Sequence, residues 1–293
     1  MITKEEKTAY VMMIPALAIL AILVGYPLVR SFWLAVSNIQ VGQKGSFVGF
    51  RNFISLAQSE TFRMTLVNSV MYTAIAVSGK VTLGLFLALI LEKATRVRKI
   101  IRGIILLPWV VPICLSTLAW WWMFDPLYSV INWTLLKLGI LPQGEGIPWL
   151  GDPFWARTAI IIVNIWRGLP FFTITLLAGL LSIPKDFTEA AKVDGAGPLY
   201  IFRHVTLPLI FPLLGIVVLY SMIMTIGDFD IVYVLTRGGP INTTHLFATL
   251  AFQEGIASGD ISRAAAISLF IFPFLGASAY FQLRIMRRRM EVL

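Results

Sequence analysis

The stretch SIPKDFTEAAKVDGAGPLYIFRHVTLP, residues 182–208, lies between two long apolar segments and carries the clearest structural signal in the sequence. Pro184 suits the first turn of a helix, and Glu189 favours the positive end of a helix dipole. Gly195 ends such a helix and allows a sharp reversal, while Pro198 prevents the same helix from continuing. The stretch predicts a short helix held at a membrane surface, although an ordinary helical loop between two spans fits these residues as well.

The apolar segments on either side belong to a strongly hydrophobic chain. Of its 293 residues, 58% are hydrophobic and 13% are charged, a composition that suits lipid as the solvent rather than water. A helix needs about 20 mostly apolar residues to cross the hydrocarbon core. Six stretches qualify, and they predict an all-α integral membrane bundle of six transmembrane helices in a single domain over residues 1–293: about 9–31, 65–91, 102–124, 156–181, 206–234 and 264–285.

The basic residues are distributed unevenly between the two sides of these spans. Because cytoplasmic loops carry an excess of Lys and Arg, the richer side is expected to face the cytoplasm, together with both termini. The net charge of +9 is then a topology signal and requires no nucleic-acid partner. The basic residues on the richer side are Lys4, Lys7, Lys93, Arg96, Arg98, Lys99, Arg102, Lys185, Lys192, Arg203, Arg284, Arg287, Arg288 and Arg289.

Signatures of catalysis and of metal binding are missing from the sequence. It contains no GxxxxGK[ST] phosphate loop and no GxSxG or HExxH motif. The one cysteine, Cys114, lies in an apolar run, and His204 and His245 are far apart in the chain, so no metal site is expected. These features predict a transporter or channel rather than an enzyme, with no catalytic residues and no cofactor bound by this chain.

The 182–208 stretch resembles the EAA loop of bacterial ATP-binding-cassette (ABC) importer permeases. The family pattern is EAA, three residues, Gly, nine residues, Ile, one residue, Leu-Pro. The chain has Glu189-Ala190-Ala191, Gly195, Val205 in place of Ile, and Leu207-Pro208 at the same spacing. In this family the loop is a coupling helix that docks into a groove on the ATPase subunit. The resemblance implies contact with the ATPase for Thr188, Glu189, Ala190, Ala191, Asp194 and Gly195.

A second resemblance lies downstream of this loop. Residues 229–240, FDIVYVLTRGGP, are similar to the outer end of the fifth span in carbohydrate-uptake permeases of the maltose, lactose and glycerol-phosphate class. The resemblance implies a permease subunit of an ATP-driven sugar importer in the bacterial cytoplasmic (inner) membrane. The implied partners are a second permease that completes a heterodimer, two ATPase subunits, an extracytoplasmic sugar-binding protein and the sugar itself. ATP and magnesium would be bound by the partner ATPase.

Two polar stripes at helical spacing lie on the spans that flank the loop. In the maltose-type permeases these two spans form the sugar site, so the resemblance implies that both stripes line the cavity. Asp, Asn and Arg side chains suit sugar hydroxyls, and Phe171 or Trp166 would cover the apolar face of a ring. The first stripe is Asn164, Arg167, Gly168 and Phe171; the second is Ser221, Thr225 and Asp228, with Asp230 two residues further on.

These residues also admit structural alternatives. Arg167 could form a structural pair with an aspartate, Lys80 could snorkel to the membrane surface, and the stripes could serve helix–helix contacts. Arg167 could also bind an anionic substrate such as a phosphorylated polyol. Other classes of function are an ABC permease for an amino acid or peptide, an ion-coupled secondary transporter, and a membrane enzyme that uses Asp228 and Asp230.

Overall fold

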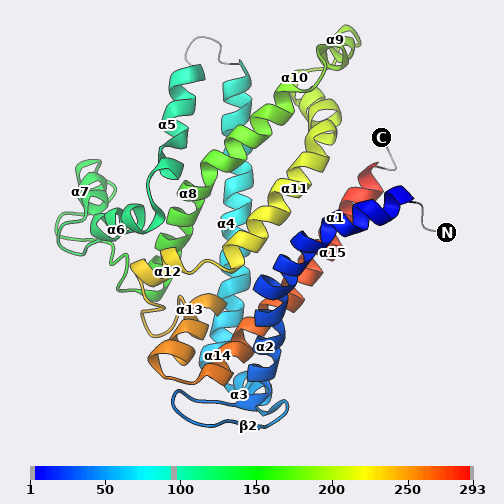
Figure 1. Cartoon of the computed structure of the whole chain (residues 1–293). Coiled ribbons are helices and arrows are strands. Elements are labelled where there is room, and N and C mark those ends of the chain that lie inside the picture. Colours follow the sequence, from blue (N-terminus) through cyan, green and yellow to red (C-terminus); the bar gives the residue numbers. More distant parts are fainter. Residues whose placement is uncertain (1–3, 94–97, 291–293) are drawn as a thin grey trace. The chain divides into compact units, whose positions relative to one another are not determined.

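The computed structural model of the chain describes residues 4–93 and 98–290 (Figure 1). The described residues form helices, turns and one two-stranded antiparallel sheet, in which β1 (Ser37–Asn38) pairs with β2 (Ser46–Phe47). The all-α class predicted from the composition is confirmed. Arg96, which the orientation argument uses, lies outside the described residues, as do residues 1–3 and 291–293.

The helices follow one another along the chain and include three single π-helical turns, labelled η. Their bounds are α1 (Lys4–Leu20), η1 (Ala21–Gly25), α2 (Tyr26–Ala35), α3 (Arg51–Gln58), α4 (Glu60–Lys93), α5 (Arg98–Val110), α6 (Ile113–Met123), α7 (Val130–Lys137), α8 (Pro153–Leu181), α9 (Lys185–Val193), α10 (Pro198–Ile201), η2 (Phe202–Thr206), α11 (Leu207–Ile226), α12 (Asp230–Leu235), α13 (Phe247–Phe252), η3 (Gln253–Ala257), α14 (Ile261–Leu269) and α15 (Ile271–Met290).

The chain divides into two compact units, of which the first comprises Met1–Phe62 and Leu250–Phe270. In this unit α14 packs against α2 and α3. The side-chain amide of Asn52 donates hydrogen bonds to the carbonyl oxygens of Ala35 (2.8 Å) and Ser37 (2.7 Å). These bonds hold the end of α2 and the start of the hairpin against α3.

The second unit comprises Arg63–Thr249 and Ile271–Leu293, and α8 forms its centre. α8 packs against α5, α11 and α12. Its first half contributes Ile160 and Val163 to one buried apolar cluster, and its second half contributes Phe172 and Leu176 to another. The polar stripe of α8 lies between these two clusters, so apolar packing on both sides fixes the segment that carries it.

Most of the predicted spans correspond to continuous helical segments. Among residues 4–93 and 98–290, five segments are long and apolar enough to cross a membrane: Tyr10–Ala35, Glu60–Lys93, Pro153–Leu181, Pro198–Ile226 and Ile261–Ile285. They match the first, second, fourth, fifth and sixth predicted spans. The sequence therefore located these five correctly, with boundaries that differ by several residues.

The third predicted span, 102–124, is not a continuous helix. Its two halves, Ile100–Val110 and Ile113–Met123, meet at an angle of 95°. Pro112 has no backbone N–H, so it cannot donate to the carbonyl of Pro108 one helical turn earlier. The break thus has a local cause, and the expectation of one continuous helix over 102–124 is wrong.

The fifth span ends earlier than the predicted 206–234, because α11 ends at Ile226. Gly227 caps α11, and glycine is a poor helix former. One carboxylate oxygen of Asp228 accepts a 3.4 Å hydrogen bond from the N–H of Ile231 in the first turn of α12. The chain therefore leaves α11 and starts a new helix, which places Asp228 in the link between the two helices.

Candidate functional site

The 182–208 stretch forms the short helix α9 that the sequence predicts. Pro184 precedes the helix as its N-cap rather than occupying its first turn. Gly195 has a φ of 81°, a left-handed conformation that glycine adopts without strain. The N–H of Ala196 donates a 2.9 Å hydrogen bond back to the carbonyl of Ala191, which closes the last turn. The predicted reversal at Gly195 is confirmed.

The six residues that the resemblance assigns to ATPase contact lie on α9 and immediately after it. Glu189, Ala190, Asp194 and Gly195 are exposed, and the other two, Thr188 and Ala191, are half-buried. Large apolar side chains around them are also exposed: Phe187, Val193, Leu199 and Tyr200. A small apolar patch beside exposed carboxylates is the kind of surface that a partner protein covers.

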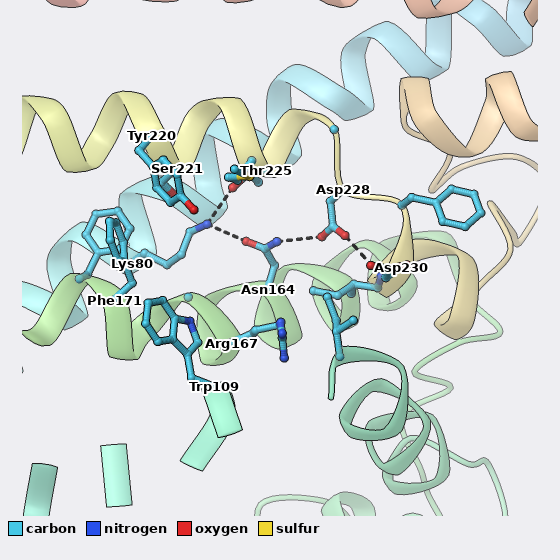
Figure 2. A pocket seen from close by; sticks show the side chains of 17 residues that line it. Lys80, Trp109, Asn164, Arg167, Phe171, Tyr220, Ser221, Thr225, Asp228 and Asp230 are labelled. Atoms are coloured by element: carbon cyan, nitrogen blue, oxygen red, sulfur yellow. Dashed lines mark hydrogen bonds between the residues drawn. The ribbon is translucent and has the colours of Figure 1, made fainter. Parts of the chain in front are cut away.

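The two polar stripes meet in one cavity of the second unit, with a volume of about 420 Å³ (Figure 2). α8 contributes the first stripe, and α11 with its link to α12 contributes the second. The structure thus brings together every residue of the two stripes, and Asp230 with them: Asn164, Arg167, Gly168, Phe171, Ser221, Thr225, Asp228 and Asp230.

A chain of hydrogen bonds runs along the cavity from α4 to the α11–α12 link (Figure 2). Lys80 Nζ donates to Asn164 Oδ1 (2.9 Å) and to Thr225 Oγ1 (2.8 Å). Asn164 Nδ2 donates to Asp228 Oδ2 (2.9 Å), and the Tyr72 hydroxyl donates to the same oxygen (2.5 Å). One amide therefore connects the ammonium of Lys80 to the carboxylate of Asp228, and both charges have the polar partners that burial requires.

Lys80 is not a snorkelling side chain, because it is only 4% exposed and its ammonium points into the cavity. Gly168 on α8 provides the space for it, since a Cβ at that position would overlap the Cδ of Lys80. The sequence signalled Lys80 as a charge inside a span, which is costly and marks a functional candidate. The direction of the side chain depends on the facing helix and was not visible in the sequence.

Arg167 does not form the structural pair with an aspartate that the sequence left open. Its Nη1 donates to the backbone carbonyls of Pro108 (3.2 Å) and Val111 (3.4 Å), and no carboxylate of the described residues lies within ion-pair distance. The Pro108 carbonyl is the acceptor that Pro112 leaves without a helical donor. Arg167 therefore lines the cavity and at the same time stabilises the break between α5 and α6.

Aromatic rings form one wall of the cavity. The ring of Phe171 stacks on that of Trp109, with centroids 5.9 Å apart and planes at 25°, and its centroid lies 5.0 Å from that of Tyr220. Trp166, the other aromatic residue proposed to cover a sugar ring, is not part of the cavity lining and contacts Trp120 edge-on. Trp109 and Tyr220 were missed, because aromatic residues are frequent throughout this chain and neither belongs to a polar stripe.

A metal centre has no support in the part of the chain that the structure describes. No group of three or more His, Cys, Asp or Glu side chains there is placed to hold an ion. His245 is buried beside Thr249, with its Nδ1 at 3.1 Å from the hydroxyl oxygen, whereas His204 stacks on Tyr200 at the surface. The cavity therefore offers hydrogen bonds, charge and ring faces rather than coordination chemistry.

Comparison with known proteins places the chain among membrane transport components. The profile of the family described as binding-protein-dependent transport system inner membrane component matches residues 80–292. The trehalose/maltose transport system permease protein MalF of Thermococcus litoralis is 35% identical over 98% of this chain and 96% of its own length. The diacetylchitobiose uptake system permease protein DasB of Streptomyces coelicolor is 32% identical over 96% of this chain and 87% of its own length.

The fold has a counterpart among solved structures. A chain of a bacterial ABC transporter involved in the import of the acidic polysaccharide alginate superposes with a TM-score of 0.81 at 23% identity, covering 97% of this chain and 96% of that one. At this identity the likeness concerns the fold alone. The family match and the close relatives decide the assignment. The chain therefore belongs to the family of binding-protein-dependent transport system inner membrane components, and it is a permease subunit of an ABC transporter rather than an enzyme.

Proposed function

We propose that this chain forms half of the translocation pathway of an ATP-driven importer for a neutral sugar, and that the sugar occupies the cavity between α8 and α11. The observation that carries the proposal is the convergence of both polar stripes on one cavity of about 420 Å³ beside stacked aromatic rings. The relatives named for the transport of trehalose, maltose and diacetylchitobiose support a sugar substrate.

The lining of the cavity suits the two kinds of surface that a sugar presents. Phe171, Trp109 and Tyr220 offer ring faces for the apolar side of a pyranose. Asn164 and Asp228 offer an amide and a carboxylate to hydroxyl groups. Asn164 and Asp228 bond to one another, so a sugar would exchange some of these hydrogen bonds for its own.

The charges around the cavity favour a neutral substrate over an anionic one. Lys80 and Arg167 supply two positive charges, and Asp228 and Asp230 supply two negative charges, so the lining is formally balanced. Lys80 is joined to Asp228 through Asn164, and Arg167 is bonded to backbone carbonyls. An anionic polyol would need a cation that is free of such partners.

The partners of this subunit follow from its family and from the exposed surface of α9. A second permease would complete a heterodimer, and two ATPase subunits would each dock on one coupling helix, here through Thr188, Glu189, Ala190, Ala191, Asp194 and Gly195. ATP and magnesium would bind to the ATPase subunits. An extracytoplasmic binding protein would deliver the sugar. Closure of the ATPases would draw the coupling helices together and shift the permease toward its outward-open state.

The proposal includes the placement of the chain in the membrane. The two compact units together would form one transmembrane domain in the bacterial inner membrane. The excess of Lys and Arg on the side of α9 supports cytoplasmic N- and C-termini. Reaction of an impermeant thiol reagent with a cysteine introduced after the last described helix, in intact and in permeabilised cells, tests this orientation directly.

Uptake into vesicles that contain the complete transporter, binding protein and ATP tests the sugar proposal. At limiting substrate, we expect Phe171→Ala to reduce the uptake of trehalose, maltose or diacetylchitobiose about tenfold, which corresponds to about 1.4 kcal/mol. Phe154→Ala is the matched control, because Phe154 is exposed and lies outside the cavity lining. Equal uptake by both variants would show that the sugar does not bind in this cavity. Uptake of glycerol phosphate but of no neutral sugar would establish the anionic alternative.

A further inference from the structure

The broken third span does not cross the membrane as a straight rod. α5 has 13 residues, which at about 1.5 Å per residue give a length of about 20 Å, whereas the hydrocarbon core is about 30 Å thick. α5 begins on the side of the second unit that carries α9 (Figure 1), and it is too short to reach the opposite surface of the hydrocarbon core. α6 then leaves it at 95°.

Arg167 supplies hydrogen bonds to the backbone at the bend. Exposed backbone groups cannot remain unpaired in hydrocarbon, so broken helices are tolerated only where other groups satisfy them. Pro112 deprives the carbonyl of Pro108 of its donor, and Arg167 Nη1 supplies a replacement at 3.2 Å. The same Nη1 lies 3.4 Å from the carbonyl of Val111. Arg167 of α8 thus pairs with two carbonyl oxygens at the bend between α5 and α6.

An exposed apolar face continues from α5 through this bend onto α6. On α5 it includes Ile104 and Val110, the latter 75% exposed, and on α6 it includes Leu115, Leu118 and Trp122, the last 62% exposed. The exposed face of a membrane-spanning helix meets lipid chains, and the α6 face extends that surface without interruption by a charged residue. Tryptophan is enriched where acyl chains meet head groups, and two exposed tryptophans, Trp121 and Trp122, lie near the end of α6.

We infer that α6 lies parallel to the plane of the membrane, in the leaflet on the side opposite to α9. Its face with Leu115, Leu118 and Trp122 is in contact with lipid. The occupant of this face is the membrane itself rather than a second protein. Its composition supports this choice, because aliphatic residues with terminal tryptophans match the boundary between acyl chains and head groups. The orientation of the chain in the membrane decides whether this is the inner or the outer leaflet. The position of α6 on the side opposite to α9 does not depend on that orientation.

The opposite face of α6 gives this position a consequence for transport. Ile113 and Trp120 pack against the buried cluster that contains Ile231 of α12, and α6 packs against α12 along its length. Ile113 and Ile231 also line the cavity. A helix in contact with lipid therefore forms part of the cavity wall, and it supports the helix that starts at Asp230.

Spin-label depth measurements can test the position of α6, using the full chain assembled with its partner subunits in lipid nanodiscs. The accessible cysteines of the partners are replaced by serine. Cys114 is exposed and is the only cysteine of this chain, so it serves as the first α6 label. Leu118→Cys and Trp122→Cys, each combined with Cys114→Ala, extend the series along one side of α6. Ile104→Cys, Leu107→Cys and Val110→Cys, again with Cys114→Ala, form an internal ruler on α5.

Collision rates with molecular oxygen and with a water-soluble nickel complex then give the depth of each label. We expect the α5 labels to shift by about 1.5 Å per residue and the three α6 labels to agree within about 3 Å, all with high oxygen access. A continued shift of about 12 Å between residues 114 and 122 would mean a straight span and overturn the inference. Low access to both reagents at all three α6 positions would mean that a protein partner covers the face, and would equally overturn it.

Discussion

Lys80 and Asp228 lie on opposite sides of a single side-chain amide, which accepts a 2.9 Å hydrogen bond from the Lys80 ammonium and donates one of 2.9 Å to the Asp228 carboxylate. The amide is that of Asn164 on α8, so the connection joins α4 to the link between α11 and α12. Removing any one of the three members leaves the others with a buried polar group or charge that lacks its partner.

The first prediction concerns this connection. Lys80→Met leaves the carboxylate of Asp228 without its compensating charge, and the loss of one partner of a buried pair typically costs about 3 kcal/mol. We expect a lower melting temperature of the purified complex and loss of uptake. Adding Asp228→Asn to Lys80→Met should recover much of the thermal stability without restoring transport. If the decrease in melting temperature of the double variant equalled the sum of the decreases of the two single variants, the two residues would not be coupled.

The second prediction concerns the space that Gly168 leaves for Lys80. A Cβ at Gly168 would overlap the Lys80 side chain, whereas a Cβ at Gly103 on α5 meets nothing within 4 Å. Gly168→Ala should therefore displace Lys80 and destabilise the complex by about 1–3 kcal/mol, the range for overpacking. Gly103→Ala is the matched control and should leave the melting temperature unchanged or raise it. Wild-type uptake and stability in Gly168→Ala would show that the close contact between Gly168 and the Lys80 side chain is dispensable.

The third prediction concerns the turn after α9. Gly195 has a φ of 81° and Gly197 does not have a positive φ, and a Cβ on either meets nothing within 4 Å. Gly195→Ala introduces backbone strain of about 1–2 kcal/mol, whereas Gly197→Ala introduces none. We expect Gly195→Ala to lower both uptake and substrate-stimulated ATP hydrolysis, with Gly197→Ala close to wild type. Identical behaviour of the two variants would argue against a role for this turn in coupling.

The fourth prediction concerns the charged contact on α9. Glu189 is exposed on the chain, in the middle of the surface that the ATPase is proposed to cover. Glu189→Lys combined with Gly195→Asp should abolish stimulated ATP hydrolysis and uptake while the permease still reaches the membrane. Co-purification of the ATPase distinguishes weaker docking from loss of signal transfer. Wild-type uptake together with wild-type stimulation would contradict the coupling assignment.

The sequence predicts those features of the fold that depend on local composition. Five of the six spans are visible because each carries a long apolar run, and α9 is visible because Pro184, Gly195 and Pro198 limit a helix by backbone chemistry. Asn164 and Phe171 share a face of α8 by helical spacing alone. Their convergence with Ser221 and Thr225 on one cavity was predictable because the family resemblance identifies which two spans face each other.

The remaining features depend on tertiary contacts that leave no local signal. Pro112 breaks its helix whereas Pro170 lies inside α8 without breaking it, and the sequence alone does not separate the two cases. The side chain of Lys80 turns inward because Gly168 faces it across the helix pair. Arg167 satisfies the carbonyl of Pro108, a role that becomes apparent only once α5 and α8 are known to pack together.

We propose that the cavity between α8 and α11 holds the sugar during transport. Electron cryomicroscopy of the complete transporter, trapped with sugar-loaded binding protein and a non-hydrolysable ATP analogue, tests it most directly. We expect density for the sugar within hydrogen-bond distance of the Asp228 carboxylate and in contact with the ring of Phe171. Sugar density held entirely by the second permease, with the Lys80–Asn164–Asp228 connection of this chain undisturbed, would contradict it.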